Sequence, residues 1–242
     1  MTYYIIVVYL YYSEEKEGAS VLNKNVYSLV LLDEVVEAVD KLAYEQRTSR
    51  SGMINRILAE YLSCPTPEGR IREIFGEMGR EASREPSFQV SARPGAAVVT
   101  IRSALHYRYR PSVRYVLELY REYLPLLGEL RVTLRTQSAP LLNLAEGFFR
   151  FFNRLENETA GRLFPEGKVP CEISPGRMRR RLRCPPGADK CTNGQLANSI
   201  LGYICEFDAD LKTYFADEGD PEEAEEAVRR HYLDYLNRAA VL

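Results

Sequence analysis

The sequence predicts an α+β protein, on the basis of three observations along its 242 residues. A short apolar strand near the N-terminus is followed at once by two amphipathic helices. Beyond residue 87, apolar and polar residues alternate, which is typical of strands with one face in water. A long apolar helix, a hairpin and two closing helices then follow, without the strand–helix–strand rhythm of a parallel sheet. We therefore expect an antiparallel sheet covered by helices on one face.

The composition is that of a globular protein, with 45% hydrophobic and 27% charged residues. The formal net charge of -2 provides no bulk attraction for a polyanion, so any nucleic-acid contact depends on a local patch. Five cysteines, an odd number, in a chain that shows no signal peptide favour reduced thiols and a cytoplasmic location. Their spacing lacks the close pairs of a zinc site. We expect neither a metal nor a cofactor.

Residues 1–20 form a distinct aromatic N-terminal arm. Its apolar part, Met1 to Tyr12, is about half the length needed to cross a bilayer and has no basic flank. We therefore expect no membrane segment, but either an extra strand or a poorly ordered arm. Ser13 to Gly18 is polar and is expected to be a linker that isolates the arm from the strand that follows.

Residues 21–64 organise the N-terminal part of the chain. Val26 to Leu31 is rich in β-branched and aromatic residues and is too short for an ordinary helix, so it predicts a strand. Asp33 is the expected N-cap of a first helix and Ser49 that of a second, and apolar residues recur along one face of each helix. A lone strand cannot pair its own edge. We expect it to pair with a second copy of the chain, which makes the protein a homodimer.

This segment resembles the ribbon-helix-helix superfamily, the Arc/MetJ/CopG-type DNA-binding proteins. The resemblance implies that two strands form an antiparallel ribbon in the major groove, while the start of the second helix holds a phosphate. It implies a dimeric, sequence-specific DNA-binding protein, most simply a transcriptional regulator. The residues that carry the likeness are Ser28-Leu29-Val30-Leu31, Asp33-Glu34-Val35-Val36, Leu42-Ala43, Ser49-Arg50-Ser51 and Ile57 to Leu62.

The resemblance assigns two groups of residues to double-stranded DNA. In its register the odd-numbered residues Tyr27, Leu29 and Leu31 face the core, and the DNA-facing set is Val26, Ser28 and Val30. The phosphate seat is Ser49, Arg50 and Ser51, which also serve as a plain helix cap. Residues 21–64 hold five basic and six acidic side chains. The alternative is therefore a dimerisation element that touches no DNA.

The remainder divides into a linker helix and a second domain. Residues 65–86 begin with Thr66 as cap and Pro67 at the first helical position. Residues 87–242 form the α+β domain, which we expect to sense a small-molecule effector or to recruit a protein partner. Its strands are predicted at 88–92, 96–105, 113–120, 129–136, 169–173 and 178–184, and its helices from 138, over 195–215 and over 221–236.

Arginines alternate along the last predicted strand. Arg177, Arg179, Arg181 and Arg183 project from one face, while Arg180 lies on the other with the apolar residues of the strand. The row predicts a secondary basic face that holds phosphates, or else a solvated face paired with carboxylates. A second mixed run offers the same choice. It comprises Arg102, His106, Arg108, Arg110 and Arg114, interleaved with Tyr107, Tyr109 and Tyr115.

No catalytic motif accompanies these features. The sequence has no phosphate-binding glycine loop, and neither histidine has a companion nucleophile at a recognised spacing. We therefore do not expect an enzyme. The leading hypothesis is a cytoplasmic DNA-binding regulator of the CopG-like type. The alternative is a dimeric interaction scaffold, an antitoxin or a mobile-element accessory factor whose C-terminal sheet binds protein.

Overall fold

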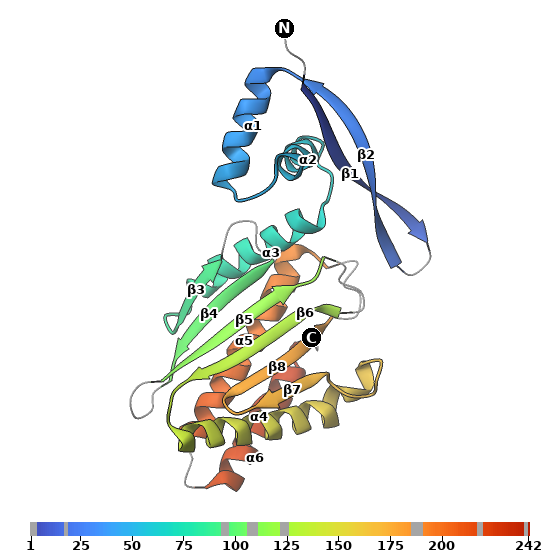
Figure 1. Cartoon of the computed structure of the whole chain (residues 1–242). Helices are drawn as coiled ribbons and strands as arrows, with labels where there is room; N and C mark the ends of the chain where they lie inside the picture. Colours follow the sequence, from blue (N-terminus) through green and yellow to red (C-terminus); the bar gives the residue numbers. More distant parts are fainter. Residues whose placement is uncertain are drawn as a thin grey trace. The chain divides into compact units, whose positions relative to one another are not determined.

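A computed structural model describes residues 4–16, 19–92, 97–105, 111–121, 126–184, 191–216, 220–239 and 242, with side chains from Tyr27 onward (Figure 1). The predicted α+β class is confirmed, since six helices accompany a six-stranded antiparallel sheet in these ranges. The chain divides into two compact units, residues 1–72 with 93–96 and residues 73–92 with 97–242. Within the described ranges, each helix is too short or too polar to cross a membrane.

Unit 1 contains a long hairpin and two helices. The hairpin is antiparallel, and its register runs from the pair Tyr4 and Leu31 to the pair Lys16 and Ala19. The elements are β1 (Tyr4–Lys16), β2 (Ala19–Leu31), α1 (Asp33–Glu45) and α2 (Arg50–Tyr61).

The hairpin corrects two expectations from the sequence. The strand that ends at Leu31 pairs with β1 of its own chain and not with the same strand of a second copy. The predicted ribbon-helix-helix element is therefore not supported. The expected linker is also wrong, because Ser13 to Lys16 continue β1. The aromatic and β-branched run of the arm favours a strand, and closing a short loop costs less entropy than recruiting a second chain.

The helices of unit 1 enclose a small core. Val36, Val39 and Ala43 of α1 are buried against Met53 and Ile54 of α2. Leu29, Leu31 and Leu58 pack on this cluster from its edge.

The inward positions of β2 are thus partly as predicted. Leu29 and Leu31 face the core, but Tyr27, which we expected there too, is 48% exposed. The cap of α1 also differs, because Leu32 is the N-cap and Asp33 lies in the first turn, where its carboxylate meets the helix dipole. The cap of α2 is Ser49, as predicted, and its Oγ accepts from the Gly52 N–H at 3.1 Å.

Unit 2 is built on the six-stranded sheet, in the order β3-β4-β5-β6-β8-β7, with every neighbouring pair antiparallel. The linker helix α3 (Pro67–Ala82) precedes it and crosses the boundary between the units. The strands are β3 (Phe88–Ala92), β4 (Val98–Ala104), β5 (Ser112–Leu119), β6 (Leu126–Arg135), β7 (Cys171–Ser174) and β8 (Arg177–Arg183). The helices are α4 (Ala139–Ala160), the 3-10 turn η1 (Gly161–Leu163), α5 (Asn193–Ala216) and α6 (Pro221–Leu236).

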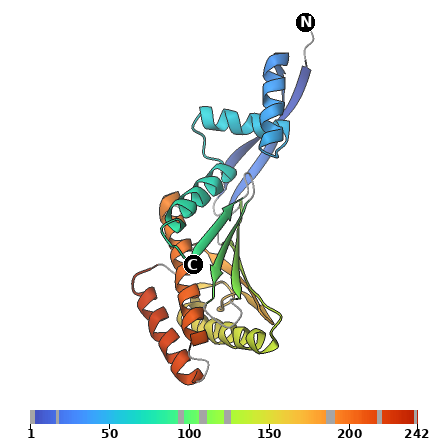
Figure 2. The same cartoon turned by 90° about the vertical axis from the view of Figure 1, so that its left-hand side faces the viewer.

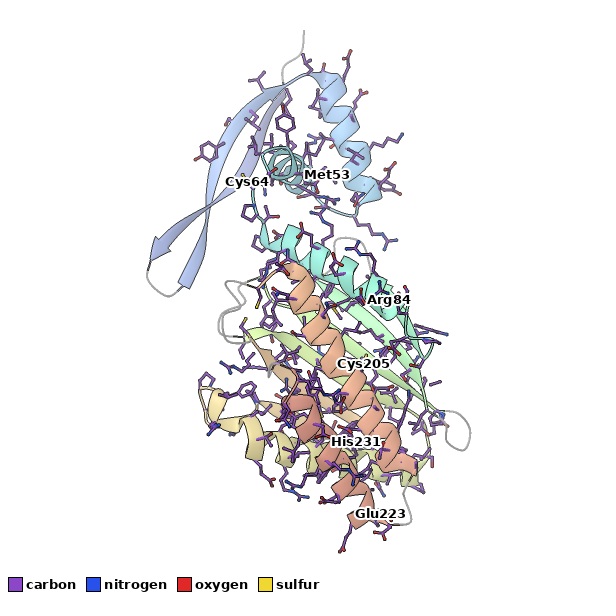
Figure 3. All side chains as sticks on the ribbon, turned by 180° about the vertical axis from the view of Figure 1, so that it is seen from behind. Met53, Cys64, Arg84, Cys205, Glu223 and His231 are labelled. Carbon is purple, nitrogen blue, oxygen red and sulfur yellow. The ribbon has the colours of Figure 1, made fainter. Side chains whose placement is uncertain are left out.

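The sheet has one covered face. Figure 2 shows α5 and α6 as successive layers on one side of it, and Figure 3 shows the same helices from behind. The Phe207 ring of α5 contacts Tyr115 of β5 and Phe148, Phe149 and Phe152 of α4, at centroid distances from 4.8 to 6.2 Å. This aromatic cluster joins α4 and α5 to the sheet.

A buried carboxylate fixes α5 above the sheet. Asp208 accepts hydrogen bonds from the Ser103 hydroxyl at 2.8 Å and from the Tyr115 hydroxyl at 2.7 Å. Lys212, one turn further along α5, lies 2.6 Å from the same carboxylate. Burial, with the charge of Asp208, raises the pKa of Tyr115 well above its ordinary value, so this hydroxyl remains a donor. The carboxylate is therefore fully partnered.

A second buried ion pair joins β8 to α4. Arg180 and Glu156 are both 0% exposed, and the guanidinium meets the carboxylate through Nη2 at 2.8 Å and Nε at 3.0 Å. The Tyr203 hydroxyl donates to Glu156 at 3.0 Å, and Arg180 also donates to the Leu242 carbonyl at 2.6 Å. Although burial acts against the charged guanidinium, the attraction of Glu156 raises the pKa of Arg180 above its ordinary value. The pair links a strand, two helices and the C-terminus.

We expect Glu156→Ala to lower the free energy of unfolding by about 3–5 kcal/mol, because it leaves a guanidinium buried without a counter-ion. Chemical denaturation followed by circular dichroism measures this. The double variant Glu156→Leu with Arg180→Met should recover most of the loss, since it removes both charges. A loss below about 1 kcal/mol in the single variant would mean that water reaches the site.

Candidate nucleic-acid interface

The outward face of β2 carries the first group of predicted DNA-binding residues. Ser28 is exposed, and Val30 is 66% exposed. Val26 lies in the same strand, although its side chain falls outside the described residues. The structure thus places Ser28 and Val30 on the face of β2 that is opposite to Leu29 and Leu31. That face offers one hydroxyl and an aliphatic surface.

The start of α2 carries the second group. Ser49 Oγ lies 3.3 Å from Ser51 Oγ, so both hydroxyls sit at the helix start, where the first N–H groups lack helical acceptors. The Arg50 guanidinium pairs with the Asp40 carboxylate through Nε and Nη2, and this hydrogen bond lowers the pKa of Asp40. Both side chains are 42% exposed. Arg50 is therefore already balanced by a carboxylate that a phosphate would have to displace.

Unit 1 also leaves large apolar side chains uncovered. Tyr44 and Tyr61 are 86% and 87% exposed, at or near the ends of the two helices. A small unit with this much uncovered apolar surface suits a partner that would bury it. The exposed set also includes Leu32, Val35, Leu42, Ile57 and Leu62.

In unit 2 the four alternating arginines lie as the sequence analysis placed them. Arg177, Arg179 and Arg181 are exposed, and Arg183 is partly exposed, on the sheet face away from the helices. Arg180 points to the covered face and is fully buried. The row therefore projects into solvent along β8.

This basic face extends beyond β8, which the sequence alone did not indicate. In β6, Arg131 lies beside Arg179, and Thr133 lies beside both Arg177 and Arg114. Arg114 in turn lies beside Arg102 of β4. The signal was present as alternation in β6, but nothing in the sequence showed that β6 and β8 are neighbours. We define the arginine face as Arg102, Arg114, Arg131, Arg135, Arg177, Arg179, Arg181 and Arg183. His106, Arg108, Arg110, Tyr107 and Tyr109, from the second mixed run, lie outside the described residues.

Three carboxylates gather at the centre of the arginine face. Glu129 is 2% exposed and accepts from the Nε atoms of Arg131 and Arg179, each at 2.6 Å. Glu118 lies 2.6 Å from Arg131, and Glu172 lies 3.3 Å from Arg179. The hydrogen bond to Glu129 is the main cause that raises the pKa of both arginines. Among described residues, no ion pair reaches the remaining six arginines, Arg102, Arg114, Arg135, Arg177, Arg181 and Arg183.

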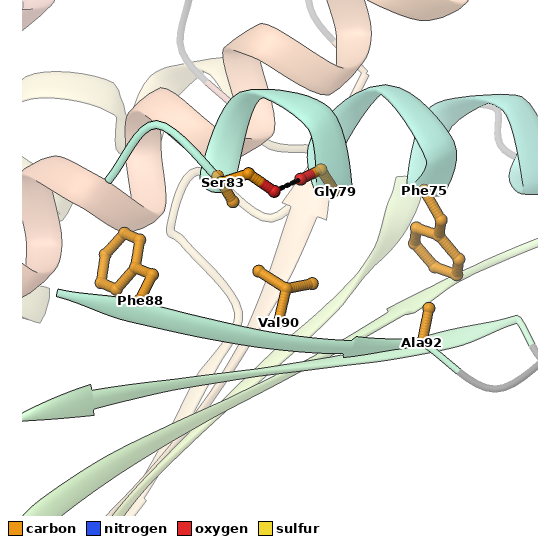
Figure 4. Close-up of a pocket in the computed structure, with 7 residues that line it drawn as sticks. Phe75, Gly79, Ser83, Phe88, Val90 and Ala92 are labelled. Carbon is orange, nitrogen blue, oxygen red and sulfur yellow. Dashed lines mark hydrogen bonds between the residues drawn. The ribbon is translucent and has the colours of Figure 1, made fainter. Parts of the chain in front are cut away.

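A hollow between α3 and β3 is a candidate place for a small effector. Figure 4 shows it, and its volume is about 290 Å³. The Ser83 hydroxyl beside it donates to the Gly79 carbonyl at 2.7 Å, so its hydrogen is already used. The lining has no charged side chain and consists of Phe75, Gly79, Ala82, Ser83, Phe88, Val90 and Ala92. The lining combines apolar side chains with the Ser83 hydroxyl.

A polar cluster of Asp210, Glu206 and His231 lies between α5 and α6. Asp210 is 0% exposed, and neither of its oxygens has a hydrogen-bond partner among the described residues. Burial and repulsion by Glu206 raise the pKa of Asp210 to about 8. His231 Nδ1 lies 3.5 Å from its Oδ1. Asp210 is therefore a proton-binding group at neutral pH.

Two half-buried thiols, Cys171 and Cys205, are poor nucleophiles. Burial raises the pKa of Cys171 to about 12, and burial likewise raises the pKa of Cys205 to about 12. Both thiols are thus protonated at neutral pH, and a thiol in that form attacks poorly.

No protein-family model, curated protein or solved structure matches the chain. The likeness to ribbon-helix-helix proteins consequently rests on the sequence of residues 21–64.

We expect Asp210 to make the protein less stable as the pH rises from about 5 to 8. The folded carboxyl keeps its proton up to a pKa of about 8, whereas the unfolded one releases it near 3.8. The folded state therefore binds more protons across this window, and its stability falls by at least about 2 kcal/mol. Asp210→Asn should flatten the profile, and Asp234→Asn, at an exposed position of α6, should not. Denaturation midpoints at several pH values measure this, and a wild-type stability that rises over the window would contradict it.

Proposed function

We propose that the chain is a dimeric DNA-binding regulator whose N-terminal unit contacts the duplex. The observation that carries the proposal is the alternation in β2, where Leu29 and Leu31 pack inward while Ser28 and Val30 are exposed. The major groove admits a two-stranded ribbon, and the β1–β2 hairpin is such a ribbon made from one chain. The Ser28 hydroxyl can hydrogen-bond to a base edge, and Val30 can contact a thymine methyl group.

The start of α2 supplies the second support. A phosphate there would meet first-turn N–H groups and the positive end of the helix dipole. Ser49 keeps its bond to Gly52, which leaves Ser51 as the adjacent hydroxyl donor. Arg50 can exchange Asp40 for the phosphate, because both side chains are accessible to solvent. The phosphate contact fixes the ribbon's position and does not itself read sequence.

The uncovered apolar residues support a dimer. Leu42, Tyr44 and Ile57 on the helices would be buried by a second copy. Such an interface uses the helices and leaves the β1–β2 pairing intact. A two-fold dimer would bind an operator of approximate two-fold symmetry. Unit 2 then senses an effector, for which the hollow lined by Phe75 and Phe88 is the candidate place.

A second candidate function is a dimeric scaffold that binds protein and no DNA. Two observations favour it. Residues 21–64 hold six acidic and five basic side chains, so they carry no net positive charge. Phosphate neutralisation normally supplies much of the affinity for DNA. Moreover, the outward face of β2 carries only one hydrogen-bonding side chain among those described, at Ser28.

Selection from a random duplex pool, followed by gel shift at a stated salt concentration, tests the regulator against the scaffold. Ser28→Ala should weaken the selected site by about 1 kcal/mol, because one base contact is lost. Arg50→Ala should weaken all duplexes and lower the salt slope by about 1. Arg80→Ala, which removes an exposed arginine from α3, is the control. Dimers, shown by ultracentrifugation, that select no duplex would favour the scaffold.

Deletion of residues 1–18 tests which strand completes the ribbon. Because β1 pairs with β2 along its whole length, the deletion should abolish DNA binding and loosen unit 1. Hydrogen exchange of the α1 and α2 amides reports the loosening, and deletion of residues 1–3 is the control. A truncated chain that stays folded, dimerises and shifts the same DNA would show that the second strand comes from another copy.

A further inference from the structure

We propose that the arginine face of unit 2 binds the phosphate backbone of duplex DNA without reading its sequence. The proposal does not depend on the function assigned to unit 1, since it concerns other strands and other residues. It makes unit 2 a second DNA-contacting surface of the chain. It is supported by the spacing of the arginines, by two N–H groups without a partner among the described residues, by the role of the carboxylates and by the nature of the rest of the face.

The spacing of the arginines fits the two sides of a groove. Arg102 of β4 and Arg177 of β8 lie in one row across the sheet, with Arg114 and Thr133 between them. Three strand-to-strand steps separate the ends of this row, which is about 14 Å. The major groove is about 12 Å wide, so long arginine side chains at the two ends can reach phosphates on both of its edges.

Two N–H groups on this face have no hydrogen-bond partner among the described residues. The Nε of Arg114 and one Nη of Arg183 are shielded from solvent and have no hydrogen-bond partner among the described residues. A buried donor without an acceptor costs about 1–3 kcal/mol. Arg114 and Arg183 are themselves partly exposed, so phosphate oxygens can reach their other N–H groups, and guanidinium groups bind phosphate in a bidentate manner.

The carboxylates organise the face instead of neutralising it. Glu129 accepts hydrogen bonds from both Arg131 and Arg179, which keeps two neighbouring guanidinium groups in place despite their mutual repulsion. Eight arginines face three carboxylates on these strands, so the surface remains positive. The positive charge is thus local, in a chain whose formal net charge is -2.

The rest of the face favours a duplex over other polyanions. Platforms for single strands stack bases on aromatic side chains, but in β4, β5, β6 and β8 the outward residues between the arginines are small, such as Thr100, Val116 and Thr133. Protein interfaces centre on buried aromatic and apolar anchors, which these outward positions also lack. Arginines that alternate along a solvent-facing strand suit a regular row of phosphates.

The test is binding of the full chain to random-sequence duplex DNA, followed by fluorescence anisotropy over a range of salt concentrations. The double variant Arg177→Gln with Arg181→Gln should lower the salt slope by about 2 and the affinity by at least tenfold at about 0.1 M salt. The matched control is Arg150→Gln with Arg229→Gln, which removes the same charge from exposed positions of α4 and α6. The control should bind as the wild type does.

Three results would overturn the proposal. They are equal losses in the double variant and the control, no loss in either, and equally tight binding of single-stranded DNA or polyglutamate through the same arginines. Thermal unfolding checks that each variant is folded, and Arg102→Gln with Arg135→Gln replaces the first pair if that pair does not fold. Random-duplex binding should survive Ser28→Ala, so a failure of the unit 1 proposal stays separate from a failure of this one.

Discussion

The register of β8 is the constraint on which unit 2 depends. A shift of one residue turns every side chain of a strand to the other face. In β8 that shift would bury Arg177, Arg179 and Arg181 in an apolar core and would expose Arg180. Burial of unpaired guanidinium groups costs far more than the sheet could recover from any alternative pairing. The alternation therefore specifies both the pairing with β6 and the solvent face.

The outward arginines disfavour other registers of β8, and Arg180 in addition favours the correct one. Its guanidinium fits only where Glu156, Tyr203 and the Leu242 carbonyl converge, so the correct register also satisfies a buried carboxylate. Such a pair need not raise stability over an apolar equivalent, but its loss on one side is costly. We infer that its role is specificity. It selects one position of β8 relative to α4 and ties the chain's C-terminus to that choice.

Local signals sufficed for much of the fold. Ser49 and Thr66 cap helices as expected, Asp220 caps α6, and Gly176 has the positive φ of 65° that the turn after Pro175 requires. These features depend on neighbours within a few residues. Alternation along β8 likewise predicted its two faces. The sequence could also place the strands and helices of unit 2 to within a few residues, because their periods differ clearly.

Long-range pairing is what the sequence did not reveal. The arginines of β6 and β8 share one surface only because the β7–β8 hairpin, which follows α4, returns to the edge of β6. Asp210 could not be singled out from α5 for a related reason. Its burial beside His231 depends on how α6 packs, and helical periodicity alone gives no sign of that.

The N-terminal hairpin is another pairing that the sequence did not reveal, and here the predicted partner of β2 was wrong. A strand such as β2 needs one partner edge, and the sequence offered two sources for it: the preceding arm or a second copy. A segment joined by a short loop acts at an effective concentration in the millimolar range, which a separate chain rarely reaches. Strand pairing between copies must therefore displace β1 first. Association through the exposed faces of α1 and α2 avoids that competition, because Leu42, Tyr44 and Ile57 are uncovered while the hairpin is intact. A dimer built on the helices would consequently form without the free-energy cost of unpairing β1 from β2. It would also keep the outward face of each hairpin available to a ligand.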